Sequence, residues 1–296
     1  MAAITAALVK ELREKTSAGM MDCKNALVAC DGDITKAIDW LREKGIAKSV
    51  KKAGRIAAEG LSRVLVDGNR AILVEINSET DFVAKNESFL ELLDTTAKVI
   101  LASDAKTNEE ALALPVDGAT LNDLFINATA TIGEKIVLRR FSVVTKNDDE
   151  FFGAYMHMGG SISALAVVKG GNEEIAKDIA MQVASMNPTY ISMEHMPADV
   201  VEHERDIQEE IVKADESLAG KPEKVLAGII AGRVSKSLQE ISLVDQIYFK
   251  DQSLKVGKFL DNAHAEVVYF ERYMVGEGIE KRHEDFAEEV AKQMGN

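Results

Sequence analysis

Apolar residues recur every three or four positions through about the first 45 residues, which predicts a small bundle of three short helices. A second helix begins near Met20, and Asp33 is the expected N-cap of a third helix that ends at Gly45. The Lys-rich segment 47–54 then reads as a connector. A bundle of this size, assigned to residues 1–54, is too small to be very stable alone.

The pattern changes in residues 55–145, where a strand, a hairpin turn at Asp67-Gly68, a strongly apolar strand and a helix follow one another. Residues 146–187 repeat that order with a turn at Met158-Gly159-Gly160, and residues 241–275 return to short strands around one helix. The repeated order predicts an α+β fold with two related core subdomains, 55–145 and 146–187 with 241–275.

Residues 188–240 interrupt the second half with two amphipathic stretches joined at Gly220-Lys221-Pro222. Two antiparallel helices with such a tip predict a protruding helical hairpin, which is a candidate for self-association. The chain closes with a C-terminal module, 276–296, in which an amphipathic helix is expected at 283–294.

Composition narrows the possible partners. The net charge is −14 and the isoelectric point is near 4.9, which argues against direct nucleic-acid binding because that requires a basic face. No apolar stretch approaches the roughly 20 residues of a membrane span, and no signal-peptide pattern opens the chain, so a cytoplasmic protein is expected. Cys23 and Cys30 share an apolar helix face and are expected to be core thiols rather than metal ligands.

No catalytic constellation is present in the sequence. The five histidines show no His-Glu-x-x-His spacing, and neither a Gly-x-Ser-x-Gly elbow nor a complete phosphate-binding loop occurs. The cluster Lys48–Lys52 is expected to be a solvated face. No cofactor, metal or enzymatic activity is therefore predicted, and a protein-binding role remains.

The segment after the second strand, Glu79-Thr80-Asp81-Phe82-Val83, is the sharpest candidate for such a role. It places a large aromatic beside a carboxylate in a strand-to-helix loop, and aromatic side chains dominate the energy of protein interfaces. The alternative is that Phe82 packs inward at the helix start while Asp81 caps the helix. The corresponding loop of the second half contains only glycine and asparagine, so the fold itself does not demand this segment.

Met20 and Met21 form a second candidate, because two adjacent residues at a helix start cannot both face one core. One methionine could be an adaptable exposed contact. Alternatively, one is buried and the other is partly covered.

These motifs resemble the bacterial elongation factor Ts family, whose members exchange guanine nucleotide on elongation factor Tu. The resemblance covers nearly the whole chain and rests on two long motifs and three shorter ones: Leu8–Arg13 with Thr16–Lys24, Asn77–Lys85, Gly133–Ile136, Tyr155-x-His157 and Val275–Lys281. Family members often carry Cys or Gln near the Asn-x-x-Thr-Asp-Phe motif, where this chain has Ser78 and Glu79. Nothing is carried over for residues 103–120 or for the hairpin tip, which look divergent.

The resemblance implies a ubiquitin-associated-like N-terminal bundle, a two-part core and contact with elongation factor Tu in its GDP-bound and nucleotide-free states. Thr80, Asp81, Phe82 and Val83 would displace Mg²⁺ from that partner. Arg13, Met20, Met21 and His157 would dock it. The rival interpretation is a ubiquitin-associated-type adaptor that tethers proteins without releasing nucleotide.

Overall fold

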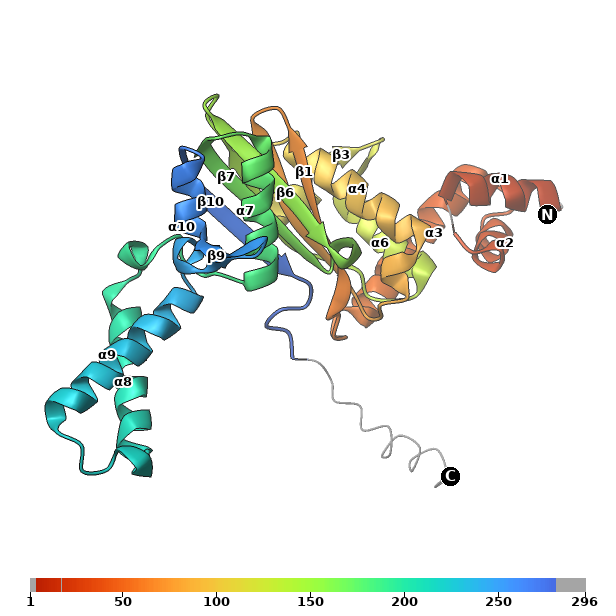
Figure 1. Ribbon diagram of the computed structural model, residues 1–296. Coiled ribbons are helices and arrows are strands. Elements are labelled where there is room, and N and C mark those ends of the chain that lie inside the picture. The colour runs from red at the N-terminus through yellow and green to blue at the C-terminus, as the bar shows by residue number, and fades with distance from the viewer. Residues whose placement is uncertain (1–3, 17, 281–296) are drawn as a thin grey trace, which may run out of the picture.

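The computed structural model describes residues 4–16 and 18–280, and Figure 1 shows three short N-terminal helices at one end of a mixed helix-and-sheet body. Helices α1 (Ala6–Thr16), α2 (Met20–Ala29) and α3 (Ile34–Lys52) enclose a core that includes Leu12, Cys23 and Leu27. Asp33 caps α3 as predicted, because its carboxylate accepts a hydrogen bond from the Lys36 amide at 3.1 Å.

The predicted end of the third helix at Gly45 is wrong, and most of the segment 47–54 that was expected to be a connector belongs to this helix. Helix α3 continues to Lys52. The glycine is buried, and a β-carbon there would be in ordinary van der Waals contact with Ile126 at 3.5 Å and Ala130 at 3.6 Å, so Gly45 lies at a helix–helix contact rather than at a helix end. Tertiary packing thus overrides the weak helix propensity of glycine.

The first sheet has the antiparallel order β1 (Glu59–Asp67), β2 (Arg70–Ser78), β5 (Val137–Thr145). One face of β2 packs under helices α4 (Glu87–Leu101) and α6 (Leu121–Ile132). A short helix, α5 (Asn108–Leu112), and a minimal hairpin, β3 (Pro115–Val116) with β4 (Ala119–Thr120), occupy the stretch between those helices.

The second sheet has the same arrangement, with the antiparallel order β6 (Glu150–His157), β7 (Ile162–Gly170), β10 (Ala265–Met274). Helix α7 (Glu173–Met186) covers its outer face together with α10 (Val256–Asn262). Between α7 and β10 lie α8 (Ala198–Ala214), α9 (Glu223–Glu240), and the short pair β8 (Ile247–Tyr248) and β9 (Asp251–Lys255). Mixed helices and antiparallel sheets confirm the α+β class.

The inner faces of the two sheets meet in a shared core, so that α4 and α7 lie on opposite outer sides of the body (Figure 1). Val64 and Leu73 of the first sheet contact Leu165 and Tyr273 of the second. Alternate residues of β2 therefore face two different cores, which explains its continuous apolar sequence.

A buried carboxylate also joins the two sheets. Glu75 of β2 is fully buried and accepts a hydrogen bond from the Gly276 amide at 2.8 Å, just beyond β10. Its other oxygen lies 2.6 Å from the Arg140 Nε, and Arg139 is 3.8 Å away. A buried charge is tolerated when it is paired and hydrogen-bonded, as here.

Helices α8 and α9 form the predicted hairpin, which projects from the second half at the end of the molecule opposite α1–α3 (Figure 1). Ile207, Ile211 and Val225 on this hairpin are 39, 46 and 46% exposed, so the hairpin leaves part of its apolar surface open to solvent. The helix expected at 283–294 lies outside the described residues. None of the helices in the described parts of the chain has the length and apolar content needed to cross a membrane.

Candidate functional site

The loop between β2 and α4, residues 79–86, presents Phe82 to solvent. The side chain of Phe82 is 79% exposed, whereas the next two residues, Val83 and Ala84, are buried in the core beneath α4. A single turn of 3₁₀ helix, Val83–Lys85, carries the chain into α4. The interpretation in which Phe82 packs inward is therefore wrong, and Val83 anchors the loop rather than facing a partner.

Asp81 does not cap α4. That role belongs to Asn86, whose side-chain oxygen accepts a hydrogen bond from the Ser88 amide at 3.0 Å. The Asp81 carboxylate lies 3.4 Å from the Lys85 ammonium, and both side chains are exposed, so the pair contributes little to stability. Asp81 thus presents a carboxylate to solvent beside the exposed ring of Phe82.

Four residues, which we call the clamp, hold the root of this loop: Glu79, Thr80, Glu134 and Lys135. Glu134 accepts two hydrogen bonds from Thr80, one from its amide at 2.9 Å and one from its hydroxyl at 2.7 Å. Glu79 in turn accepts a hydrogen bond from the Lys135 amide at 2.6 Å. Each of the two segments therefore supplies a carboxylate to the backbone of the other.

The clamp also reaches the segment that follows α3. Arg55 lies 3.2 Å from the Glu79 carboxylate, and the Lys135 ammonium donates to the carbonyls of Ala53 and Arg55 at 2.7 and 2.9 Å. Lys52, the last residue of α3, donates to the Gly133 carbonyl. Nothing in the sequence pattern predicted this role of Glu134, whose one signal was its place in the Gly133–Ile136 motif of the family resemblance.

Met20 and Met21 are 60% and 62% exposed at the start of α2, so the interpretation in which one of them is buried is wrong. The inward positions of this helix are taken by Cys23, Ala26 and Leu27 instead. Arg13, on the preceding helix, is also exposed. The core of the N-terminal helices therefore does not need Met20 or Met21, and both remain free to contact a partner.

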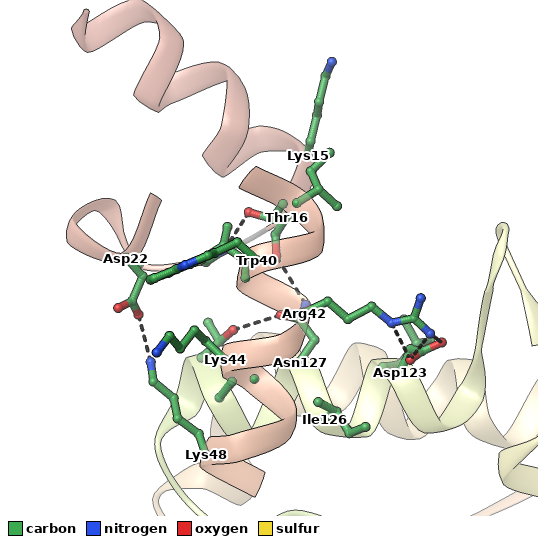
Figure 2. Close-up of a pocket in the computed structure, with 18 of the residues that line it drawn as sticks. Lys15, Thr16, Asp22, Trp40, Arg42, Lys44, Lys48, Asp123, Ile126 and Asn127 are labelled. Atoms are coloured by element: carbon green, nitrogen blue, oxygen red, sulfur yellow. Dashed lines mark hydrogen bonds and ion pairs between the residues drawn. The ribbon is translucent and has the colours of Figure 1, made fainter. Parts of the chain in front are cut away.

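The N-terminal helices are fixed to the first half along α6, beside a cavity of about 280 Å³ (Figure 2). Arg42 makes a two-pronged contact with Asp123, with nitrogen–oxygen distances of 2.8 and 3.0 Å. Asn127 donates to the Thr16 carbonyl at 3.3 Å. Lys48 pairs with Asp22 at 3.0 Å, so the lysine cluster is not simply a solvated face.

His157 ends β6 and is half-buried, with its Nδ1 lying 3.2 Å from the Tyr155 hydroxyl. The next residue, Met158, is 75% exposed and has a left-handed backbone with φ of 49°. That conformation disfavours a side chain as large as methionine. Sequence reasoning assigned Met158 only to a turn.

The structure does not gather the predicted residues into one pocket. Within residues 4–16 and 18–280, no hydrogen bond or ion pair joins Thr80–Val83 to Arg13, Met20, Met21 or His157. They form separate patches carried by one body, which suits a broad protein surface better than a small-molecule site.

Desolvation raises the pKa of Tyr248, Tyr269 and Tyr273, and the pKa of Tyr273 is raised the most. Desolvation raises the pKa of Tyr269 to about 12, and desolvation also raises the pKa of Tyr248, whose hydroxyl donates to Asp178 at 2.6 Å. Both hydroxyls therefore stay protonated at neutral pH. Among the described residues, no group of three or more His, Cys, Asp or Glu side chains could hold a metal ion.

Comparison with known proteins agrees with these features. The family model of Elongation factor TS matches residues 79–277. The chain is 52% identical to elongation factor Ts of Oenococcus oeni, with 99% of each chain covered. It is 54% identical to that of Leuconostoc mesenteroides, covering 99% of this chain and 100% of the relative, and 52% identical to that of Acholeplasma laidlawii, covering 98% and 99%. The chain therefore belongs to the elongation factor Ts family.

Proposed function

We propose that this chain accelerates the release of GDP from elongation factor Tu by inserting Phe82 into the partner's nucleotide domain. Exchange of guanine nucleotide on elongation factor Tu is the role of the elongation factor Ts family. The observation that carries the proposal is the 79% exposure of Phe82 on a loop that is anchored on both sides. An exposed aromatic ring is unfavourable in water, and its burial in a pocket of the partner stabilises the complex.

The mechanism is displacement of Mg²⁺ from the partner. Phe82 enters between helices of the nucleotide domain and shifts the elements that hold the metal and the phosphates. Mg²⁺ neutralises phosphate charge, so its loss weakens nucleotide binding sharply. Asp81 contributes a carboxylate beside the ring, while Thr80 and Val83 hold the two ends of the inserted segment. No bond is made or broken, and the chain needs no cofactor.

Docking is assigned to the N-terminal helices and to the end of β6. The exposure of Arg13, Met20 and Met21 supports contact with the nucleotide domain, since methionine adapts its shape to a partner surface. His157 is a further contact.

We assign separate roles to separate parts of the chain. The ubiquitin-associated-like bundle of residues 1–54 docks on elongation factor Tu. Residues 55–145 carry the inserted loop. Residues 146–187 with 241–275 form the related second subdomain, the helical hairpin of residues 188–240 offers a surface for self-association, and residues 276–296 form a C-terminal module. The partner is bound in its GDP-bound and nucleotide-free states, without direct contact to nucleic acid.

The test is to mix the chain with elongation factor Tu that carries fluorescent GDP and to follow the loss of fluorescence. Acceleration that rises with the concentration of the chain and then saturates is the expected result. Binding without acceleration would reject exchange and leave the tethering adaptor as the better interpretation.

Linkage provides an independent test. If the chain lowers the affinity of the partner for nucleotide, then nucleotide must lower the affinity for the chain by the same factor. Titration calorimetry should therefore show much tighter binding to the empty partner than to the GDP–Mg²⁺ form. Equal affinities for both forms would contradict the proposal.

A further inference from the structure

We propose that Glu134 is a positioning residue, which fixes the direction of Phe82 through its two hydrogen bonds to Thr80. The inference rests on the proposed function, because it assigns Glu134 a part in nucleotide release. Glu134 lies 54 positions away from Thr80 in sequence, on the turn after α6, and it is partly buried.

The two contacts fix orientation as well as position. The Thr80 amide and hydroxyl bind different oxygens of the same carboxylate, at 2.9 and 2.7 Å. The Ser78 hydroxyl meanwhile donates to the Thr80 carbonyl at 2.9 Å. The backbone donor, the backbone acceptor and the side chain of Thr80 are therefore all engaged, which leaves this residue little freedom to rotate.

On the other side of Phe82 the chain is fixed by burial. Val83 is 8% and Ala84 6% exposed, and both lie in the core under α4. Only Asp81 and Phe82 remain outside between these two anchors. A side chain that is already held in its bound direction loses less conformational entropy on insertion, so pre-organisation makes insertion of Phe82 more favourable.

The same clamp connects the loop to the docking helices. Glu79 is bound by the Lys135 amide and by Arg55, and Lys52 at the end of α3 reaches the carbonyl of Gly133. The exposed ring and the helix that carries the docking module thus share one root. A shift of that root would misalign both surfaces at once.

The fold alone does not require this arrangement. In the second half, Gly171 and Asn172 join the corresponding strand and helix, and Asn172 caps α7. Among residues 4–16 and 18–280, no carboxylate from another segment binds this link. The clamp accompanies only the longer loop, the one that exposes an aromatic.

The experiment combines Glu134→Gln with Phe82→Ala in a double-mutant cycle, measured by release of fluorescent GDP from elongation factor Tu. Glutamine keeps the size of the side chain but loses the charge that strengthens both hydrogen bonds, and its NH2 group can contact the Thr80 hydroxyl only as a donor, which reverses the direction of that bond. We expect Glu134→Gln to lower the maximal release rate about tenfold, since small misplacements cost this much or more. The half-saturating concentration should change far less, and Glu134→Gln should have no further effect once Phe82 is alanine.

Glu109→Gln is the matched control, because Glu109 is an exposed residue of α5 and its substitution changes the charge equally. It should leave the release rate unchanged. Multiplicative loss in the double variant, or equal loss from Glu109→Gln, would overturn the positioning role.

Hydrogen exchange of the free protein separates this inference from the proposed function. The amides of residues 79–86 should exchange faster in Glu134→Gln than in the wild type, whereas the amides of the loop at Gly171-Asn172 should not change. Unchanged exchange at 79–86 would overturn the clamp even if nucleotide release is confirmed. Failure of the wild type to release GDP would reject the function and leave the hydrogen-exchange result to decide the clamp.

Discussion

The two halves of the body solve the same connection in different ways. In each half the second strand of an antiparallel hairpin leads to a helix that covers the sheet, and in each half an asparagine caps that helix. The second half makes the connection with Gly171 and Asn172, whereas the first half uses residues 79–86. The longer link adds Val83 and Ala84 to the core beneath α4 and exposes Asp81 and Phe82, and neither feature has a counterpart in the short link.

The glycines of the second half show how tight the short link is. Gly170 has a φ of 72°, and a β-carbon there would approach the His264 carbonyl to 2.3 Å. The loop of the first half contains no glycine. Its Thr80 amide instead donates to the Glu134 carboxylate, and its Glu79 carboxylate accepts a hydrogen bond from the Lys135 amide. One loop is therefore shaped by the absence of side chains, and the other is shaped by their contacts.

The largest expected effect contrasts two phenylalanines of the first half. Phe82→Ala should slow nucleotide release by an amount equivalent to about 2 kcal/mol or more, as for an interface hot spot, while the melting temperature stays near that of the wild type. Phe89→Ala, at a fully buried position of α4, should instead cost about 3–5 kcal/mol of folding stability. Stopped-flow release and thermal unfolding of both variants make the measurement. A large loss of stability in Phe82→Ala would show that this ring supports the fold.

The next effect tests the short link. Gly170→Ala should destabilise the protein by at least about 2 kcal/mol, because it combines a left-handed backbone with a backbone clash. Gly68→Ala is the control, since its φ is 55° but no atom lies within 4 Å of a β-carbon there. It should cost only about 1–2 kcal/mol of backbone strain. Urea unfolding of both variants gives the difference, and equal losses would mean that contact with His264 is unimportant.

A smaller effect concerns the feature that the halves share. Asn86→Ala and Asn172→Ala each remove a helix cap and should each lower the free energy of unfolding by about 1 kcal/mol. If only Asn86→Ala also slows nucleotide release, then the cap of α4 takes part in holding the exposed loop. Equal effects on release would show that the two caps are not functionally distinct.

The smallest expected effect concerns two ion-paired aspartates, Asp123 in the first half and Asp215 in the second. Desolvation raises the pKa of Asp123, but hydrogen bonds from Thr120 and Arg42 outweigh it and hold this pKa below its ordinary value of 3.8. Its ion pair therefore stabilises the protein above the unfolded-state pKa, and this contribution is lost as the pH falls through the lower folded-state pKa. In the second half, a hydrogen bond from Ser217 chiefly lowers the pKa of Asp215, which also pairs with Arg233 at 3.4 Å.

Melting curves between pH 5 and pH 3 test this difference. Asp123→Asn should reduce the acid-dependent fall in Tm by about 2 °C or less, and Asp215→Asn should change it less still, because the Asp215 carboxylate is more exposed than that of Asp123. A larger effect from Asp215→Asn would reverse the ranking of the two ion pairs.

The sequence predicted the elements whose signals are local. The turn at Asp67-Gly68, the N-cap at Asp33 and the repeated strand-to-helix order are all written in short stretches of chain, and the structure contains each of them. The sequence motifs predicted membership of the elongation factor Ts family, and the comparisons confirm this prediction. Residue roles in docking and Mg²⁺ displacement stay predictions.

What the sequence could not predict depends on contacts between distant segments. Gly45 looked like a helix end because the residues that bury it, Ile126 and Ala130, lie some 80 positions away. The pairing of Glu134 with Thr80 is equally long-range, and so is the face-to-face packing of the two sheets. Local periodicity says which face of an element is apolar, but it does not say which partner covers that face.

The buried contact between Glu75 and Gly276 has a mechanical consequence. It ties the first sheet to the end of β10 in the second, inside a core that both sheets share. Close-packed interiors have low compressibility, so a force applied at Phe82 spreads through both sheets instead of opening a hinge between them. If Phe82 enters a partner as proposed above, this body therefore resists deformation on its own side of the contact.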